Sequence, residues 1–385
     1  MTVQSKKCWN TKRLQTLASF EGGGTPSRSN PEYFAKGTIP WVKTLDLNNS
    51  YILNTEESIT EIALKKSSCK ILPKESVLIA MYGGFNQIGR TGILTKEAAI
   101  NQAITAVILD RQKLLPKYLL YYLNFNVQKW KKFAVSSRKD PNITKEDIKK
   151  FYVTFPNNVM EQQKIVAVLE TWDNAIGLTK RRIEQKELQK KYLMQQLLTG
   201  RTRLKGFTDK WENVRLKQLC SIQKGQQLNA NTLTKNGKYA CLNGGIIPSG
   251  YTTKWNTEAN TISISEGGNS CGYVNWNDSR FWAGGHCYTL ANVKISNFFL
   301  YFVLKNKEGH IMNLRVGSGL PNIQRPSLEK LLLKIPSAQK EQQAIANVLS
   351  SCDKGIDLLK QKLAKLEEQK KGLMQVLLTG KVRMI

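Results

Sequence analysis

Residues 161–203 read EQQKIVAVLETWDNAIGLTKRRIEQKELQKKYLMQQLLTGRTR, and residues 341–383 read EQQAIANVLSSCDKGIDLLKQKLAKLEEQKKGLMQVLLTGKVR. The two stretches align without a gap at a constant offset of 180 residues, and about half of their positions are identical. An internal repeat means that one structural unit occurs twice, so it fixes the architecture of a chain before any local motif is read. The sequence therefore predicts two related halves.

Apolar residues in both stretches recur at alternating spacings of three and four, the pattern of a coiled-coil helix. The predicted seam consists of Leu169, Trp172, Ile176, Ile183, Leu193, Leu197, Leu349, Ile356, Leu359, Leu363, Leu366, Leu373 and Leu377. Lys190 and Lys370 interrupt it at equivalent positions, where we look first for a contact to a partner protein. Each helix should run for about 39 residues, roughly 58 Å, and stop at Gly200 or Gly380. Each helix needs a partner for its stripe, and the expected partner is its own copy.

The repeats divide the chain into four parts, with boundaries at 1–156, 157–203, 204–336 and 337–385. The first and third parts read as globular domains, and the second and fourth as the repeated helices. Trp211 and Arg215 echo Trp9 and Arg13 in spacing, and Pro-Asn-Ile occurs at both 141–143 and 321–323. The predicted fold class is α+β: two pseudo-repeated mixed α/β domains separated by two long helices that pair as an antiparallel coiled coil. Within the first domain we expect strands at 39–42, 76–81 and 101–109, and a helix from Pro116.

The charge is strongly one-sided, with 58 Lys+Arg against 29 Asp+Glu and a formal net charge of +29. An anionic partner would screen such a charge, and nucleic acid is the expected one; the alternative is a generic basic surface. The seven cysteines form no CxxC pair, which favours free thiols in a reducing cytoplasm over a disulfide frame or a zinc site. No apolar run in the sequence reaches the length of about 20 residues that a membrane span needs. We expect a cytoplasmic protein without membrane contact.

Signatures of catalysis are missing from the sequence. There is no GxxxxGK[ST] loop for nucleotide phosphates, and the glycine-rich residues 20–24 do not lie in a βαβ pattern. Residues 140–143, Asp-Pro-Asn-Ile, match only half of an amino-methyltransferase motif, and a structural turn is the more common meaning. The two histidines, His286 and His310, have no further ligands at metal spacing. We predict a chain that is not an enzyme and binds no metal or cofactor itself.

Polar side chains in the predicted loops are the candidate contacts to DNA. Basic residues, which most often contact phosphate or remain solvated, are Arg28, Lys43, Arg90, Arg138, Lys139, Lys224, Lys254, Arg280 and Arg315. Amides that could pair with adenine, or could instead be structural turn residues, are Asn101, Gln102, Gln226, Asn243, Asn269 and Asn322. The remaining candidates are Thr25, Ser27, Tyr82, Tyr251 and His286, the last of which could equally be a structural histidine.

Taken together, these features resemble the specificity subunit of a Type I restriction–modification enzyme. The resemblance covers essentially the whole chain. It is carried by the duplicated Glu-Gln-Gln helix starts at 161 and 341, the Leu-Leu-Thr-Gly helix ends, and Gly-Thr-Pro-Ser at 24–27 before Ile-Pro-Trp at 39–41. In the second half, Asn-Gly-Gly at 243–245 and Gly-Gly-His-Cys at 284–287 resemble a recurrent type of target-recognition domain.

The resemblance implies a division of labour. Two target-recognition domains would each read half of a bipartite duplex DNA site, and the paired helices would set the spacer. Two methyltransferase subunits with S-adenosylmethionine would modify adenine, and up to two ATP- and Mg-dependent restriction/translocase subunits would cut unmodified DNA. Two alternatives stay open: the specificity subunit of a methyltransferase-only complex, and a coiled-coil scaffold that binds nucleic acid generically.

Overall fold

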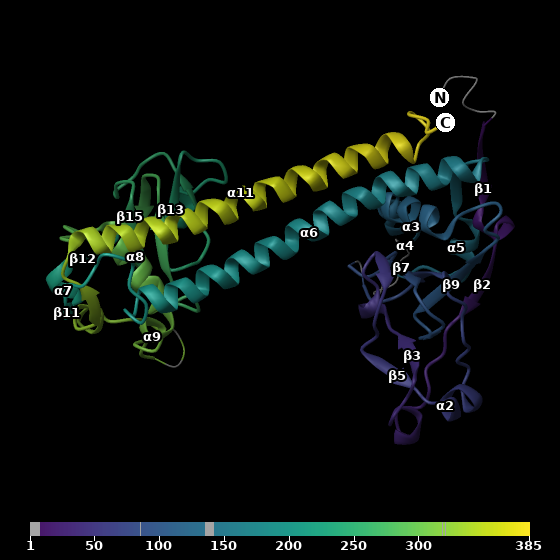
Figure 1. Cartoon of the computed structure of the whole chain (residues 1–385), viewed down its shortest axis with the longest axis horizontal. Helices are drawn as coiled ribbons and strands as arrows, with labels where there is room; N and C mark the ends of the chain where they lie inside the picture. The colour runs from purple at the N-terminus through teal and green to yellow at the C-terminus, as the bar shows by residue number, and fades with distance from the viewer. Residues whose placement is uncertain (1–7, 85, 135–141, 318, 320) are drawn as a thin grey trace. The chain divides into compact units, whose positions relative to one another are not determined.

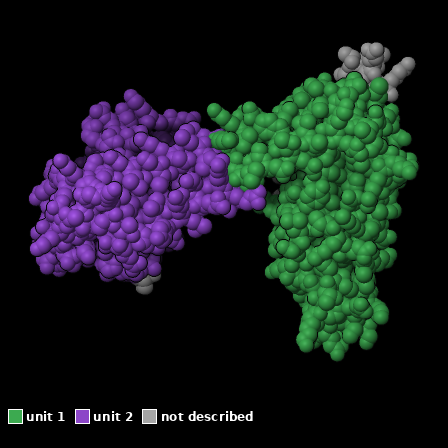
Figure 2. Space-filling model, viewed as in Figure 1, with its two compact units in different colours: residues 1–179, 362–385 green, residues 180–361 purple. Residues whose placement is uncertain are grey.

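The computed structural model describes residues 8–84, 86–134, 142–317, 319 and 321–385. Its chain forms two compact units, coloured separately in Figure 2. Unit 1 comprises residues 1–179 and 362–385, and unit 2 comprises residues 180–361. Each unit thus contains one globular domain together with a part of each of the two long helices, α6 (Val159–Leu197) and α11 (Gln339–Leu377).

Unit 1 is built from two sheets and a strand pair. Its strands are β1 (Trp9–Arg13), β2 (Ala18–Gly22), β3 (Ile39–Val42), β4 (Ser50–Ile52), β5 (Glu57–Ile59), β6 (Val77–Ala80), β7 (Thr91–Leu94), β8 (Ala99–Ile100), β9 (Ile104–Leu109) and β10 (Tyr152–Pro156). Its α-helices before α6 are α2 (Glu61–Lys66), α3 (Pro116–Phe125), α4 (Val127–Ala134) and α5 (Lys145–Lys150), and its 3₁₀ turns are η1 (Leu14–Thr16), η2 (Pro31–Tyr33) and η3 (Thr44–Asp46). The predicted strand at 39–42 and the helix start at Pro116 are confirmed, whereas β9 begins at Ile104 because residues 101–103 form a turn.

Unit 2 repeats this plan with fewer strands. Its strands are β11 (Trp211–Arg215), β12 (Ser221–Lys224), β13 (Tyr239–Leu242), β14 (Gly250–Thr252), β15 (Thr261–Ser265), β16 (Val274–Asn277), β17 (Phe281–Ala283), β18 (Cys287–Ala291) and β19 (Leu332–Pro336). Its shorter helices are α7 (Leu216–Leu219), η4 (Ala230–Thr232), α8 (Asn297–Asn306), α9 (Glu308–Met312) and α10 (Arg325–Glu329).

The sheets of the two units have the same topology. In unit 1 the order is β2-β9-β6-β7-β4, and in unit 2 it is β12-β18-β15-β16. The smaller sheets, β5-β3-β8 and β14-β13-β17, both combine one antiparallel and one parallel pairing. Strands β1 and β10, and likewise β11 and β19, pair antiparallel, so Trp9 faces Pro156 and Trp211 faces Pro336. The scaffold is therefore duplicated although the sequences between the matching anchors differ, and β4 is an addition of unit 1.

The long helices pair antiparallel within each unit (Figure 1). In unit 1, Arg383 beyond the end of α11 contacts Glu161 at the start of α6, at 2.6 Å. In unit 2, Arg203 beyond the end of α6 contacts Glu341 at the start of α11, also at 2.6 Å. Both helices span 39 residues, and Gly200 and Gly380 follow them with φ of +71° and +69°. The predicted helix length, the antiparallel arrangement and the glycine caps are confirmed.

The predicted seam residues are all buried or half-buried, and those at the helix ends, namely Leu169, Leu193, Leu197, Leu349, Leu373 and Leu377, belong to the domain cores. Seven of them are buried, namely Leu169, Ile176, Ile183, Leu197, Leu349, Ile356 and Leu377. Trp172, Leu193, Leu359, Leu363, Leu366 and Leu373 are half-buried. The end of α11 packs into the core of unit 1 beside Trp9 and Tyr118, and the end of α6 packs into the core of unit 2 beside Leu216 and Phe299. The helices are thus integral to the hydrophobic core of each domain.

The two lysines of the seam have internal partners. Lys370 forms an ion pair with Asp173 at 2.5 Å inside unit 1, and Lys190 forms the equivalent pair with Asp353 inside unit 2. Both lysine side chains are mostly covered, at 19% and 20% exposure. Each lysine that interrupts the seam is therefore paired with an aspartate of the other long helix, and a contact from Lys190 or Lys370 to a partner protein stays a prediction.

Candidate nucleic-acid interface

A hollow of about 590 Å³, lined largely by polar residues and glycines, opens on the surface of unit 2. It is lined by Lys224, Asn243, Gly244, Gly245, Glu266, Gly267, Gly268, Asn269, Ser270, His286, Pro321 and Asn322. Five of these were candidates from the sequence: Lys224, Asn243, Asn269, His286 and Asn322. The fold brings together residues from five separate stretches of sequence, and amides, a lysine and an imidazole are side chains that contact bases and phosphates.

Strand ends hold the hollow in place. Lys224 is the last residue of β12, Asn243 follows β13, Glu266 follows β15, and His286 precedes β18. Gly244 and Gly268 each have a φ of +78°, a left-handed conformation that glycine adopts without strain. The glycine loops observed in the sequence are therefore the turns that bring these four side chains to one surface.

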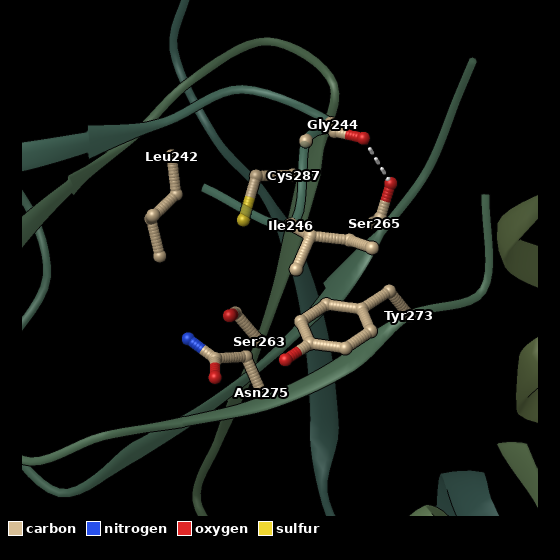
Figure 3. A pocket seen from close by; sticks show the side chains of 9 residues that line it. Leu242, Gly244, Ile246, Ser263, Ser265, Tyr273, Asn275 and Cys287 are labelled. Carbon is tan, nitrogen blue, oxygen red and sulfur yellow. Dashed lines mark hydrogen bonds between the residues drawn. The ribbon is translucent and has the colours of Figure 1, made fainter. Parts of the chain in front are cut away.

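The loop after β13 is fixed from behind. The Asn243 Oδ1 atom accepts a hydrogen bond from the His286 backbone N–H at 2.9 Å. The Ser265 hydroxyl donates to the Gly244 carbonyl at 2.7 Å, the bond drawn in Figure 3. Behind this loop, the pocket between Leu242, Tyr273 and Cys287 has a volume of only about 10 Å³. The loop is thus closely packed, and Asn243 has a structural role that limits its amide oxygen as a reader of bases.

Glu266 is a buried carboxylate in the wall of the hollow, and sequence reasoning missed it. Its residue is 8% exposed. Its Oε1 atom accepts from Lys224 Nζ at 2.7 Å and from the Tyr288 hydroxyl at 2.9 Å. Burial, together with the bond to Glu266, raises the pKa of Tyr288 to about 12, so this hydroxyl remains a donor at neutral pH.

The second oxygen of Glu266 points toward the exposed imidazole of His286. Among the described residues, Oε2 has no hydrogen-bond partner. It lies 3.6 Å from Nδ1 of His286, whose side chain is 63% exposed. An acid directly before a Gly-Gly turn was the one signal in the sequence, because a carboxylate buried at the end of a strand requires polar partners.

Unit 1 has the same backbone arrangement with different side chains. The Met81 N–H donates to the Ala103 carbonyl at 2.8 Å, and the Ile143 N–H donates to the Met81 carbonyl at 3.0 Å. In unit 2 the Glu266 N–H donates to the His286 carbonyl at 2.9 Å, and the Ile323 N–H donates to the Glu266 carbonyl at 2.8 Å. Met81 and Ala103 are therefore the structural counterparts of Glu266 and His286. The scaffold does not require a carboxylate and an imidazole at these positions.

In unit 1, the candidates Thr25 and Gln102 lie together on the surface. The Thr25 hydroxyl donates to the Gln102 side-chain oxygen, and both residues are exposed. The backbone of Gly23 packs against Asn101 so closely that a Cβ atom would lie 2.0 Å from the Asn101 carbonyl oxygen. Asn101 is half-buried, and its Oδ1 atom caps the turn by accepting from the Ala103 N–H at 3.2 Å. Of these residues, Thr25 and Gln102 are the ones that are free to face a ligand.

Arg28 and Lys43 form a charge cluster with two glutamates. Arg28 contacts Glu57 at 2.7 Å, and its guanidinium lies 4.6 Å from the Phe34 ring centroid. Lys43 contacts Glu56 at 2.6 Å and Glu57 at 2.7 Å. The hydrogen bonds that Glu57 accepts from Arg28 and then Lys43 lower the pKa of Glu57, and the hydrogen bonds that Lys43 donates to Glu56 and Glu57 raise the pKa of Lys43. The structure therefore neutralises both basic side chains internally.

The other candidates divide by their partners. Arg280 is paired with Glu258 at 2.9 Å and lies 4.3 Å from the Trp255 ring centroid. Arg90 is half-buried and has no side-chain partner among the described residues. Exposed candidates outside the hollow are Ser27, Tyr82, Gln226, Tyr251, Lys254 and Arg315. Arg138 and Lys139 lie outside the described residues.

Two kinds of feature are absent from the described part of the chain. No group of three or more His, Cys, Asp or Glu side chains there could hold a metal ion. None of the helices in those ranges is both long and apolar enough to cross a membrane.

The sequence of this chain is similar to that of known proteins. The family model of the Type I restriction modification DNA specificity domain matches twice, at residues 6–188 and 208–368. A putative type I specificity subunit of Mycoplasma genitalium is 37% identical over 152 residues, 39% of this chain and 39% of the relative. The specificity subunit of the Type I restriction enzyme MjaVIII, from Methanocaldococcus jannaschii, is 24% identical over 416 residues, 97% of this chain and 93% of the relative. The first relative is thus matched over about two fifths of its length.

Solved structures share the fold over almost the entire chain. The S subunit of a Type I restriction–modification system from M. genitalium has a TM-score of 0.67 at 18% identity and covers 96% of both chains. A chain from a study of assembly and conformational transition of the type I restriction–modification system has a TM-score of 0.61 at 15% identity, covering 96% of this chain and 97% of that one. The predicted fold class is confirmed. With two matched domains and a shared fold, this chain belongs to the Type I restriction–modification DNA specificity family.

Proposed function

We propose that this chain selects the DNA sequence on which a Type I restriction–modification complex acts. Unit 1 and unit 2 would each read one half of a bipartite duplex site. The observation that carries the proposal is the duplication of the specificity domain on one scaffold with different loop side chains. Met81 and Ala103 in unit 1 stand where unit 2 has Glu266 and His286, so the two half-sites should differ.

The net charge of +29 supports binding to a polyanion. Charge alone would also suit the generic scaffold for nucleic acid, which the two family matches do not favour. The hollow of unit 2 adds what such a scaffold would lack, because it is a fixed arrangement of polar groups from five stretches of chain. Fixed donors and acceptors discriminate between base edges, whereas a diffuse charge does not.

The chain itself would be non-catalytic within this proposal. Two methyltransferase subunits would bind S-adenosylmethionine and modify adenine, and up to two restriction/translocase subunits would use ATP and Mg²⁺. A complex with methyltransferase subunits alone is the second form that the same specificity chain could serve. The presence of genes for restriction subunits beside the gene for this chain separates the two forms.

The test is a domain exchange read out by methylation-sensitive sequencing of DNA. Cells with and without this chain should differ in methylation at one bipartite motif. Replacing residues 204–336 by the equivalent domain of another family member should change one half of the motif and leave the other half and the spacer length unchanged. A change in both halves would contradict modular reading, and the absence of any motif would contradict the function itself.

A further inference from the structure

We propose that Glu266 holds His286 in the tautomer protonated on Nδ1, so that Nε2 accepts a hydrogen bond from the amino group of an adenine or cytosine. The inference rests on the proposed function and adds to it a positioning residue and the polarity of one base contact. His286 would be the reader, and Glu266 would act through it.

The geometry around Glu266 leaves one acceptor for His286. Lys224 and Tyr288 both donate to Oε1, and among the described residues nothing donates to Oε2. A buried carboxylate oxygen without a donor is unfavourable. Nδ1 of His286 is 3.6 Å away, so a movement of under about 1 Å brings the two atoms within hydrogen-bond distance. Of the two neutral tautomers of His286, only the one protonated on Nδ1 can donate a hydrogen bond to Oε2 of Glu266.

The same bond fixes the chemistry at the other side of the ring. In a neutral imidazole one nitrogen is a donor and the other an acceptor. If Nδ1–H donates to Glu266, Nε2 carries the lone pair. The His286 side chain is 63% exposed and lines the hollow, and its Nε2 atom makes no hydrogen bond within the described ranges. An acceptor here pairs with the N6 amine of adenine or the N4 amine of cytosine in the major groove.

Direct reading by Glu266 is disfavoured because Oε2 itself is inaccessible to solvent. A purely structural role is disfavoured by unit 1, where Met81 and Ala103 occupy the equivalent backbone positions. Met81 is 7% exposed and Glu266 is 8% exposed, so the site is equally buried in both units. A carboxylate is less favourable than a methionine at a buried position if only packing matters. The imidazole of His286 beside it supplies a reason for the carboxylate to be there.

The first experiment measures the tautomer directly. The full chain has two histidines, so ¹⁵N-histidine labelling gives two imidazole spin systems, and His286→Gln assigns them. At about pH 8.5, where an ordinary imidazole is neutral, the wild-type His286 should show Nδ1–H. In Glu266→Gln the side-chain NH₂ can donate to Nδ1, so the Nε2–H form should increase. A wild-type ring protonated on Nε2, or a tautomer unchanged by the substitution, would overturn the proposal.

The second experiment reads base preference with the complete complex acting on a randomised DNA library. Glu266→Gln turns Nε2 into a donor, so preference at one base pair of one half-site should move from adenine or cytosine to guanine or thymine on the same strand. We expect a change of about tenfold or more at that pair. Tyr288→Phe, which removes a bond to Oε1 but leaves Oε2 and His286, should keep the wild-type preference.

A double variant guards against misfolding. Glu266→Met with His286→Ala introduces the unit 1 pair, which the scaffold is known to accommodate in Met81 and Ala103. It should retain the other half-site and lose discrimination at the one base pair. Adding Glu266→Gln to His286→Ala should change nothing further, because the glutamate acts through the ring. If the wild-type complex reads a motif that Glu266→Gln leaves intact, this inference fails while the proposed function stands. If the wild type reads no motif, both fail.

Discussion

Lys370 near the end of α11 donates to Oδ1 of Asp173 at 2.5 Å, while the Tyr121 hydroxyl donates to Oδ2 of the same aspartate at 2.6 Å. Burial and the bond to Asp173 raise the pKa of Tyr121 well above its ordinary value, so the phenol stays protonated. One carboxylate therefore ties α3 and α11 to α6 within unit 1.

Lys370→Met should destabilise unit 1 by about 1 kcal/mol. Asp173 is 43% exposed, which keeps the loss near that of a solvent-screened pair. Urea unfolding of the full chain measures it. Lys371→Met removes the exposed neighbouring lysine and serves as the matched control. Equal effects of the two variants would show that the Asp173 pair contributes nothing.

Ile356→Asn should separate the long helices in unit 2. Ile356 is 5% exposed, so an amide there has neither water nor another polar group to bond to. We expect the free energy of unfolding to fall by about 3 kcal/mol. Leu358→Asn, on the same helix but at a residue that is 65% exposed, should be nearly neutral. Thermal unfolding compares them. If the Leu358 variant were destabilised and the Ile356 variant were not, the buried face of α11 would be the one that contains Leu358.

Arg90→Ala and Arg28→Ala should differ in their effect on the salt dependence of DNA binding. Arg28 is already paired with Glu57, whereas Arg90 has no side-chain partner in the described residues. Loss of a phosphate contact lowers the slope of log K against log salt by about 1. We therefore expect a reduced slope for Arg90→Ala and an unchanged slope for Arg28→Ala, measured by fluorescence anisotropy between low and moderate salt. The reverse result would assign the phosphate contact to Arg28.

Acid should unfold the wild type and Arg383→Met at different pH. Burial is the largest single influence on Glu161 and disfavours its charged form, but the hydrogen bonds and the charge of Arg383, together with the hydrogen bond from the Met384 N–H, hold the pKa of Glu161 below its ordinary value. A carboxylate with a lowered folded-state pKa stabilises the fold above the unfolded pKa, and this contribution is lost as pH falls through the folded pKa.

Without Arg383, burial of Glu161 is opposed mainly by the hydrogen bond from the Met384 N–H, so the pKa of Glu161 should rise. Arg383→Met should then lose stability at a higher pH than the wild type does, as measured by unfolding free energy between about pH 7 and 3. When Glu161→Gln is already present, adding Arg383→Met should change the acid profile much less, because no carboxylate titrates at position 161. Identical acid profiles for wild type and Arg383→Met would contradict the assignment.

The repeated sequence was sufficient to predict the helices, their length and their partner, because heptad spacing and the Gly200 and Gly380 caps are local signals. The Pro-Asn-Ile repeat also located Ile143 and Ile323, whose N–H groups bond to Met81 and Glu266. What local patterns could not show was strand pairing, because β13 with β17 and β3 with β8 join residues far apart in sequence.

The candidate DNA contacts show the same limit. Glu57 and Glu56 neutralise Lys43 from another strand and loop, so a basic residue that looked available in sequence is paired in the structure. Glu266 was overlooked because its importance depends on His286, Lys224 and Tyr288, which only the folded sheet brings to it. Residue type suggested the chemistry of the hollow, and tertiary structure decided which side chains remain free.

The two lysine–aspartate pairs have a consequence for ancestry. Asp173 and Asp353 are equivalent positions of the repeat, as are Lys190 and Lys370, and each pair joins one copy to the other. A single helix with both residues is self-complementary: it can bind an antiparallel copy of itself through two identical contacts, as in an isologous homodimer. Glu161 with Arg383 and Glu341 with Arg203 repeat this logic. A chain with one copy of the helix would therefore have the contacts for a symmetric dimer, and duplication within one gene would place both copies in a single chain.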